Sequence, residues 1–283
     1  MKSSPPEVDY SQKWYVLSAV GMGVFLATID GSIVNISLPT LVNFFETDFA
    51  LVQWVVLSYL LAVTTLMLGV GRLADIYGKK PIYTTGFIVF TTGSVLCGLS
   101  PTIYTLIGFR VLQAVGASMI MALGMAIVTE AFPGSERGRA LGISGTIVSV
   151  GIAVGPTLGG LIVQNLSWHW IFFVNLPIGI IGTFMVMRYV PAFKPPGGQR
   201  FDYWGALTLC VSLLSLLVAL TLGQRVGFGN PTVLLLIGTW VVFLALFILI
   251  ELRLEQPMLD LRLFRRTLFS VSLATGFMIF ICL

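Results

Sequence analysis

Long apolar runs recur along this chain, and their length constrains the fold more than any other feature of the sequence. Eight runs are long enough to cross the roughly 30 Å hydrocarbon core of a bilayer as α-helices: residues 14–38, 51–70, 82–99, 103–128, 141–163, 170–190, 204–222 and 233–250. A ninth begins near Leu268 and reaches Leu283. None alternates apolar and polar residues as a half-buried strand would. We therefore expect an all-α membrane protein built as a helical bundle.

Composition supports the bilayer as the solvent of this chain. Charged residues make up 10% of it and hydrophobic residues 57%, whereas soluble domains carry about 25% charged residues. A soluble core could not bury so much apolar surface. The first run is too long for a signal peptide and has no small-residue cleavage site, so we interpret it as a retained helix. The cysteines, Cys97, Cys210 and Cys282, all lie in apolar runs and indicate buried small side chains instead of disulfides.

Basic residues are distributed unevenly across the predicted membrane. If the N-terminus is cytosolic, the inside segments hold 14 of the 16 Lys and Arg residues. The outside loops then hold only Arg225, and Arg110 lies within an apolar run. This bias favours a cytosolic N-terminus in the cell membrane, and we expect a bacterial, multi-pass protein. The same asymmetry accounts for the net charge of +4 without a nucleic-acid partner.

A Pro- and Gly-rich stretch at residues 191–203 divides the chain, because prolines and glycines stop helices there. We expect a six-helix half at residues 1–190, a cytosolic linker at 191–203 and two additional transmembrane helices at 204–250. A basic segment at 251–267 would lie on the cytosolic face or form a plain loop. Residues 268–283 would form a truncated ninth helix. Since the chain ends inside an apolar run, we expect it to be the N-terminal part of a longer protein.

Two opposite charges lie inside apolar runs. Asp30 is ten residues from the outer end of the first run, about 15 Å deep, and Arg110 lies about 13 Å deep in the fourth. A carboxylate at this depth costs several kcal/mol unless it is protonated, paired or hydrated. We hypothesise that Asp30 takes up and releases protons, coupled to Arg110 and to Gln113 one turn further along. The alternatives are a side chain that only hydrogen-bonds a neighbouring helix and a permanent structural ion pair.

A short basic loop bounded by glycines joins the second and third runs. Glycines permit the turn conformations that so short a loop needs, and its acidic residue is bracketed by basic ones. We expect a cytosolic gating loop that acts as a charged latch between helices, with topology control by the lysines as the alternative. The positions of interest are Gly71, Asp75, Gly78, Lys79 and Lys80.

Glycines recur every four residues in the fifth run. Gly151, Gly155 and Gly159 share one helix face, where missing side chains let another helix approach closely. Pro156 removes a backbone donor and bends the helix, which suits an element that rocks. Gly160 completes the stretch. Ordinary small-residue packing is the alternative interpretation.

The start of the sixth run is rich in aromatic residues. Trp168, Trp170 and Phe172 lie where an outer aromatic belt is expected. His169 is the only histidine, so we expect a solvated interface residue and no metal site. The sequence offers no nucleophile–base pair or metal cluster, so we expect neither an enzyme nor a cofactor.

Together these motifs resemble the major facilitator superfamily, and most closely its fourteen-helix drug:proton antiporter branch. The similarity extends over essentially the whole chain. The glycine-rich stretch of residues 151–160 matches the antiporter pattern and favours an exporter over a symporter. Ile76 and Ala114 depart from the family, since a basic residue and a glycine are usual at these positions. The other matching positions are Asp30, Asn35, Pro39, Gly71, Asp75, Gly78, Lys79, Lys80, Arg110, Gln113, Gly116, Trp168, Trp170, Phe172, Asn175 and Pro177.

The resemblance implies a major-facilitator-type bundle, in which two six-helix halves enclose a central cavity and exchange by rocking. This chain would hold the first half, two extra helices and the start of a ninth. The missing second half would supply the other cavity wall and the latch partner of Asp75. The implied function is proton-coupled efflux of amphipathic drugs or other small molecules across the cell membrane, with protons from outside binding Asp30.

Two other functions stay open. An importer of the same fold could carry a nutrient or metabolite. A non-transporting half-bundle could act as a membrane sensor or scaffold, and it would tolerate changes of Asp30 and Arg110. In every case the expected partners are a small molecule, protons and the lipid bilayer.

Overall fold

The computed structural model describes residues 10–192, 201–254 and 261–282. Within these ranges the chain is helical and contains no strand, and eight helical segments are long and apolar enough to span a membrane. The prediction of an all-α membrane protein is thereby confirmed. The chain divides into two compact units, Met1–Gly197 and Gly198–Leu283. The boundary falls in the predicted linker, of which residues 193–200 lie outside the described residues. The finer division into domains stays a prediction.

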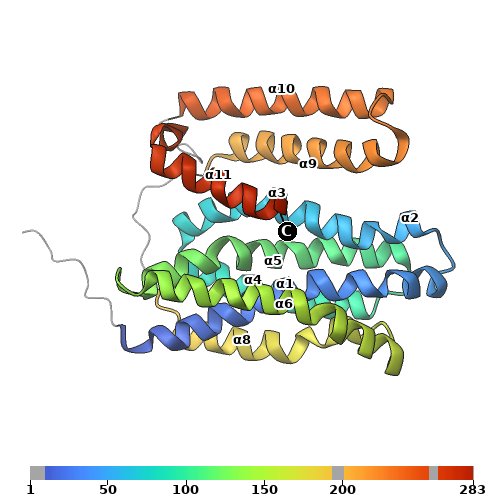
Figure 1. Ribbon diagram of the computed structural model, residues 1–283, viewed down its shortest axis with the longest axis horizontal. Helices are drawn as coiled ribbons and strands as arrows, with labels where there is room; N and C mark the ends of the chain where they lie inside the picture. The colour runs from blue at the N-terminus through green and yellow to red at the C-terminus, as the bar shows by residue number, and fades with distance from the viewer. Residues whose placement is uncertain (1–9, 193–200, 255–260, 283) are drawn as a thin grey trace, which may run out of the picture. The chain divides into compact units, whose positions relative to one another are not determined.

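The first unit holds six of the eight candidate spans (Figure 1). A 3₁₀ turn, η1 (Tyr10–Gln12), precedes the first helix. Two spans each consist of a four-residue helix followed by a longer helix. The break between the two helices falls at Gln53 in one span and at Val174 in the other. The helices are α1 (Lys13–Phe44), α2 (Phe49–Val52), α3 (Trp54–Tyr77), α4 (Lys79–Gly98), α5 (Ile103–Ala131), α6 (Arg137–Asn165), α7 (Trp170–Phe173) and α8 (Asn175–Tyr189).

The second unit contains a helical pair and a shorter apolar helix. Its elements are α9 (Tyr203–Val226), α10 (Pro231–Arg253), η2 (Leu261–Arg265) and α11 (Thr267–Cys282). The Asp202 and Asn230 side chains cap α9 and α10, because each accepts a hydrogen bond from a backbone N–H in the first turn. Part of the predicted basic segment, residues 255–260, lies outside the described residues.

The expectation of a short loop from Gly71 to Pro81 between the second and third runs is wrong, because these residues are helical except for Gly78. Helix α3 continues to Tyr77 and α4 begins at Lys79, so Gly78 alone joins them. Its φ of 94° is a conformation that suits glycine and few other residues. Gly71 lies inside α3 instead of in a turn. The apolar run of residues 51–70 ends where we expect the hydrocarbon to end. Helix α3 continues beyond it to Tyr77, because polar residues can remain helical in water.

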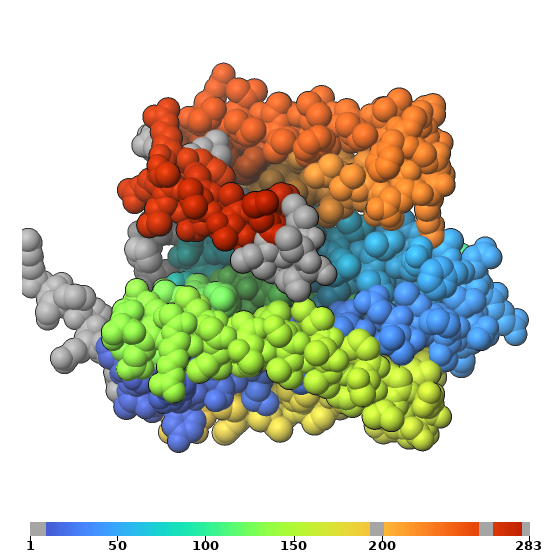
Figure 2. All heavy atoms as spheres, viewed as in Figure 1, coloured from blue at the N-terminus to red at the C-terminus, as the bar shows by residue number. Residues whose placement is uncertain are grey.

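Helix α1 is central to the first unit, since α5, α6 and α8 all pack against it. Helices α4 and α5 approach each other closely at Gly116, where a Cβ atom would lie 2.7 Å from Phe90 Cα and 2.6 Å from the Gly86 carbonyl oxygen. Only a glycine fits this contact, which brings the buried faces of α4 and α5 together. Helix α6 is less covered, and its side chains Val150, Ile152 and Leu161 are exposed. Figure 2 shows atoms of this helix, coloured yellow-green, on the near face.

Candidate functional site

Asp30 lies in the middle of the longest helix and is fully buried. It is 17 residues after Lys13 and 14 before Phe44, since α1 extends beyond Pro39. The carboxylate is therefore farther from the end of α1 than from the end of the apolar run. Helix α5 places Arg110 and Gln113 on the same face, three residues apart, and both are fully buried against α1. The structure thus brings together the three residues that the sequence singled out as a group.

Three donors surround the Asp30 carboxylate. Arg110 Nη1 lies 2.5 Å from Oδ2, and Gln113 Nε2 donates to Oδ1 at 2.9 Å. Asn175 Nδ2, from the first turn of α8, donates to the same Oδ1 at 3.0 Å. A buried carboxylate needs such donors to offset its lost hydration. Every described contact to the Asp30 side chain is a donor.

Arg110 is held in place from several sides. Its Nε donates to the Val55 carbonyl oxygen at 3.0 Å, and its Nη1 also donates to Gln113 Oε1 at 2.8 Å. The guanidinium lies over the Tyr59 ring, with Cζ 4.0 Å from the ring centroid. This stacking suits a planar cation. Helices α1, α3 and α5 therefore meet at one cation.

Four members were not assigned to this site from the sequence: Asn175, Ser94, Cys97 and Tyr59. Asn175 Nδ2 also donates to Ser94 Oγ at 3.0 Å, and Ser94 in turn donates to the Phe172 carbonyl oxygen at 2.9 Å. Cys97 Sγ lies 3.7 Å from Gln113 Oε1, and Tyr59 stacks as described. Asn175 alone among them was singled out from the sequence, as a position that matches the family pattern. We call Asp30, Arg110, Gln113, Asn175 and Ser94 the Asp30 network.

The glycine face of α6 packs directly on α1. A Cβ atom at Gly151 would collide with Thr28 Oγ1, and one at Gly155 would collide with Ser32 Oγ. A Cβ at Gly159 would lie 2.9 Å from Ile33 Cγ1. Ser32 Oγ donates to the Gly151 carbonyl oxygen at 3.2 Å and ties the two helices together.

The other two residues of the glycine-rich stretch lie elsewhere. Gly160 has no neighbouring atom within 4 Å of where its Cβ would be. Pro156 is exposed, and α6 continues through it without interruption. The close contact with α1 therefore depends on three of the five residues. Their role in transport stays a prediction.

The predicted gating residues do not gather around Asp75. Asp75 is exposed, and among the described residues it has no ion pair or side-chain hydrogen bond. Lys79 instead pairs with Glu130 at the end of α5. Lys80 is half-buried in the first turn of α4. The latch between helices therefore remains a prediction.

One end of the first unit carries its basic residues. In the described part of this unit, every Lys and Arg except Arg110 lies near the start of α1, α4 or α6 or near the end of α3 or α8. Lys13 pairs with Glu136 at 2.7 Å and links the start of α1 to the segment before α6. Tyr15 stacks on Tyr189, with ring centroids 4.8 Å apart, and links it to the end of α8.

The opposite end is aromatic, but it does not form the predicted belt. Trp168 and Phe172 are buried, and Trp168 packs against Phe44. Trp170 alone of the three predicted belt residues is exposed. The His169 ring stacks on Trp168 with centroids 3.9 Å apart, and its partial burial lowers the pKa of the imidazole. The described residues contain no cluster of metal-binding side chains.

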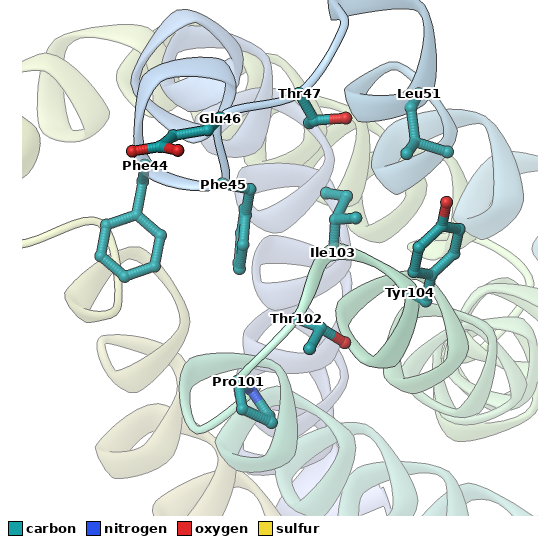
Figure 3. A pocket seen from close by; sticks show the side chains of 9 residues that line it. All are labelled: Phe44, Phe45, Glu46, Thr47, Leu51, Pro101, Thr102, Ile103 and Tyr104. Carbon is teal, nitrogen blue, oxygen red and sulfur yellow. The ribbon is translucent and has the colours of Figure 1, made fainter.

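A cavity of about 480 Å³ opens at this aromatic end (Figure 3). It lies between the turn after α1 and the segment that joins α4 to α5. Glu46 is its only charged lining residue, and it has a positive φ of 48°. The cavity contains no member of the Asp30 network. Its lining residues are Phe44, Phe45, Glu46, Thr47, Leu51, Pro101, Thr102, Ile103 and Tyr104.

Comparisons with known proteins agree on one family. A family model described as Major Facilitator Superfamily matches residues 20–283. The chain is 41% identical over 268 residues to a protein named riboflavin transporter RibZ from Clostridioides difficile (strain 630), covering 94% of this chain and 57% of that protein. It is 38% identical over 260 residues to multidrug resistance protein Stp from Mycobacterium tuberculosis (strain CDC 1551 / Oshkosh), covering 92% and 48%.

A third relative and two solved structures complete the comparison. Multidrug resistance protein 3 from Bacillus subtilis (strain 168) is 33% identical over 271 residues, covering 95% of this chain and 52% of that protein. The structure of PepTSo, a POT family transporter, has a TM-score of 0.57 at 14% identity and covers 87% of this chain and 54% of its own. A bacterial homologue of the human lysosomal transporter Spinster has a TM-score of 0.50 at 20% identity, covering 84% and 61%.

The two structural comparisons show the fold alone, because both identities are low. The chain spans about half the length of the curated relatives that it matches.

Proposed function

Because the chain belongs to the Major Facilitator Superfamily, whose members are membrane transporters and not enzymes, we propose that it takes part in proton-coupled efflux of amphipathic small molecules across the cell membrane. The observation that carries the proposal is the buried Asp30 carboxylate, held by Arg110 and Gln113 in the middle of α1. Intramembrane ionisable groups mark ion and proton pathways far more often than they serve packing alone.

In the proposed cycle, a proton from outside binds Asp30 and cancels its charge. The attraction between α1 and α5 at Arg110 then weakens, because a neutral carboxyl group attracts the guanidinium less than a carboxylate does. This change favours release of the bound substrate to the outside. Loss of the proton to the cytosol restores the ion pair. The basic end of the first unit faces the cytosol in this proposal, together with the N-terminus.

The glycine face of α6 supports a moving contact between α6 and α1. Small residues let helices slide or rock with little rearrangement of side chains. The two-half design of such transporters requires a second wall for the cavity. We therefore propose that exchange involves further helices, beyond the eight candidate spans of this chain, in the same protein or in a partner.

A second candidate function is uptake of a metabolite. It is favoured by the relative at 41% identity, whose name is riboflavin transporter, while the other two relatives are named for multidrug resistance. Both functions can use the same protonatable carboxylate. They differ in the direction in which the substrate moves relative to the proton.

Transport into vesicles tests the proposal. The protein, as expressed in its native membrane, is reconstituted with a trapped pH dye, and ethidium and riboflavin serve as probes. Substrate movement should be driven by a proton gradient, in the opposite direction to the protons for an exporter. Asp30→Asn should reduce this coupling by about two orders of magnitude, since it removes the only proposed proton site.

Asp48→Asn is the matched control, because Asp48 is an exposed carboxylate before α2 without a side-chain capping bond. It should keep the wild-type rate. Full coupling in Asp30→Asn would refute proton exchange at this site. Movement of substrate and protons in the same direction would favour uptake.

A further inference from the structure

Protonation of Asp30 poses a hydrogen-bonding problem that the Asp30 network has to solve. All three described contacts to the carboxylate are donors, from Arg110, Gln113 and Asn175. A protonated carboxyl group carries an O–H that needs an acceptor, and a buried donor without one is costly. One of the three neighbours must therefore offer an oxygen when the proton arrives.

Arg110 and Gln113 are poorly suited to this task. A guanidinium has five N–H donors and no acceptor. Gln113 has an amide oxygen, but Arg110 Nη1 already donates to it at 2.8 Å and Cys97 Sγ lies 3.7 Å from it. Turning this amide would break its contact with Arg110 and direct its NH₂ group at the cation.

Asn175 is the remaining neighbour, and its oxygen is free. Asn175 is fully buried, and its Oδ1 is one of the buried side-chain atoms of the described residues that have no hydrogen-bond partner. Its Nδ2 donates to Asp30 and to Ser94. Rotation by a half-turn about the terminal torsion of an asparagine exchanges its oxygen and nitrogen, and this torsion is soft.

Asp30 and Ser94, the two groups that Asn175 Nδ2 contacts, can each bond to an oxygen at that position instead. Ser94 has a single O–H, which donates to the Phe172 carbonyl oxygen while Asn175 Nδ2 donates to Ser94 Oγ. A hydroxyl can redirect its proton, so Ser94 would leave the Phe172 carbonyl oxygen and donate to the turned amide oxygen. Asp30 accepts when it is ionised and can donate when it is protonated. We infer that Asn175 is a positioning residue that turns its amide when Asp30 gains a proton, so that its nitrogen binds the carboxylate and its oxygen binds the carboxylic acid.

None of the other titratable groups near Asp30 has a described hydrogen bond in which it accepts from the Asp30 carboxyl group. Arg110 comes from α5, Tyr59 from α3 and Cys97 from α4. The Tyr59 hydroxyl donates to the Ala27 carbonyl oxygen at 3.4 Å. The titratable side chains of α6 and α8 lie in the first turn of α6, as Arg137 and Arg139, and at the end of α8, as Arg188 and Tyr189. Helix α7 has none.

The inference rests on the proposed protonation of Asp30, and infrared difference spectroscopy separates the two. A pH step applied to the reconstituted protein should produce the carbonyl stretch of a protonated carboxyl group, and Asp30→Asn should abolish it. If the band is absent in the wild type, or persists in Asp30→Asn, the proposed function fails first. The inference is then tested by Asn175→Leu, a change of similar volume without donor or acceptor.

In Asn175→Leu the Asp30 band should shift to higher frequency, because its O–H loses its acceptor. The exchange rate should fall about tenfold, while substrate binding at fixed pH stays within about twofold. Asn165→Leu is the control, since Asn165 is exposed and bonds only within its own helix. A band at the wild-type frequency in Asn175→Leu would overturn the inference and leave the proposed function standing.

A second measurement avoids any variant at Asn175. With ¹³C-labelled asparagine amides, the pH step on the wild type should shift one amide carbonyl band, as a free oxygen becomes hydrogen-bonded. The shift should disappear in Asp30→Asn. An unchanged amide region in the wild type, alongside a clear Asp30 band, would equally overturn the inference.

Discussion

At the scale of single residues, removal of Arg110 alone should cost more stability than removal of Arg110 and Asp30 together. Arg110 bonds to Asp30, Gln113 and the Val55 carbonyl oxygen and stacks on Tyr59. Its removal leaves a buried carboxylate without its counter-charge, whereas removal of both charges leaves neither unpaired. A buried ion pair is costly to break and often neutral to replace as a whole.

We predict that Arg110→Leu lowers the free energy of unfolding by about 3–5 kcal/mol. The double variant Asp30→Leu/Arg110→Leu should recover most of that loss. Thermal unfolding in detergent micelles measures both. If the double variant is no more stable than Arg110→Leu, the cost comes from lost packing around the guanidinium and not from the unpaired carboxylate.

The sequence was informative about these two residues for a physical reason. A charge in an apolar run is so costly that it must be paired or functional, so Asp30 and Arg110 identify each other. Gln113 follows from the helical repeat. Ser94 and Cys97 could not be found in this way, because small neutral residues are common in membrane helices and carry no comparable penalty.

At the scale of helices, the contact between α1 and α6 depends on three positions. A Cβ at Gly155 would collide with Ser32 Oγ and lie 2.8 Å from Ser32 Cβ and 3.1 Å from the Ile33 backbone nitrogen. The same substitution at Gly160 meets no atom within 4 Å. The two glycines therefore form a matched pair in one helix.

We predict that Gly155→Ala destabilises the protein by about 1–3 kcal/mol, since overpacking of a close contact forces a shift of α6. Gly160→Ala should be neutral or stabilising by up to about 1 kcal/mol, because alanine favours the helix. Unfolding temperature in detergent gives the comparison. Equal effects of the two changes would mean that α6 does not pack on α1 through this face.

The helix ends were harder to predict than the helices. Apolar length reports where a helix leaves the hydrocarbon, not where it stops. The Asp75 segment shows this, since α3 keeps its charged last turns and ends only at Tyr77. The breaks at Gln53 and Val174 escaped prediction because neither residue carries a strong helix-breaking signal.

At the scale of the whole molecule, charged residues are distributed unevenly between the two ends of the first unit. Its basic end contains Lys13, Lys79 and the segment before α6, while the opposite end contains Glu46 and Asp48. This asymmetry predicts that the basic end lies in the cytosol.

Labelling of introduced cysteines on intact cells checks this orientation. A membrane-impermeant maleimide should modify the Asp48→Cys variant and should reach the Ser135→Cys variant only after the cells are opened. Both positions are exposed at opposite ends of the first unit. The wild type gives the background from the native cysteines. Labelling of Ser135→Cys on intact cells would invert the proposed topology.

The position of Asp30 midway along α1 has an electrical consequence. A membrane potential of 100 mV is worth about 2.3 kcal/mol for one elementary charge that crosses the whole bilayer. A proton that reaches Asp30 from outside crosses roughly half of that field and gains about 1 kcal/mol. Occupancy of the proposed proton site would therefore rise as the cell interior becomes more negative. Protonation of this carboxylate would therefore respond to the membrane potential as well as to the external pH.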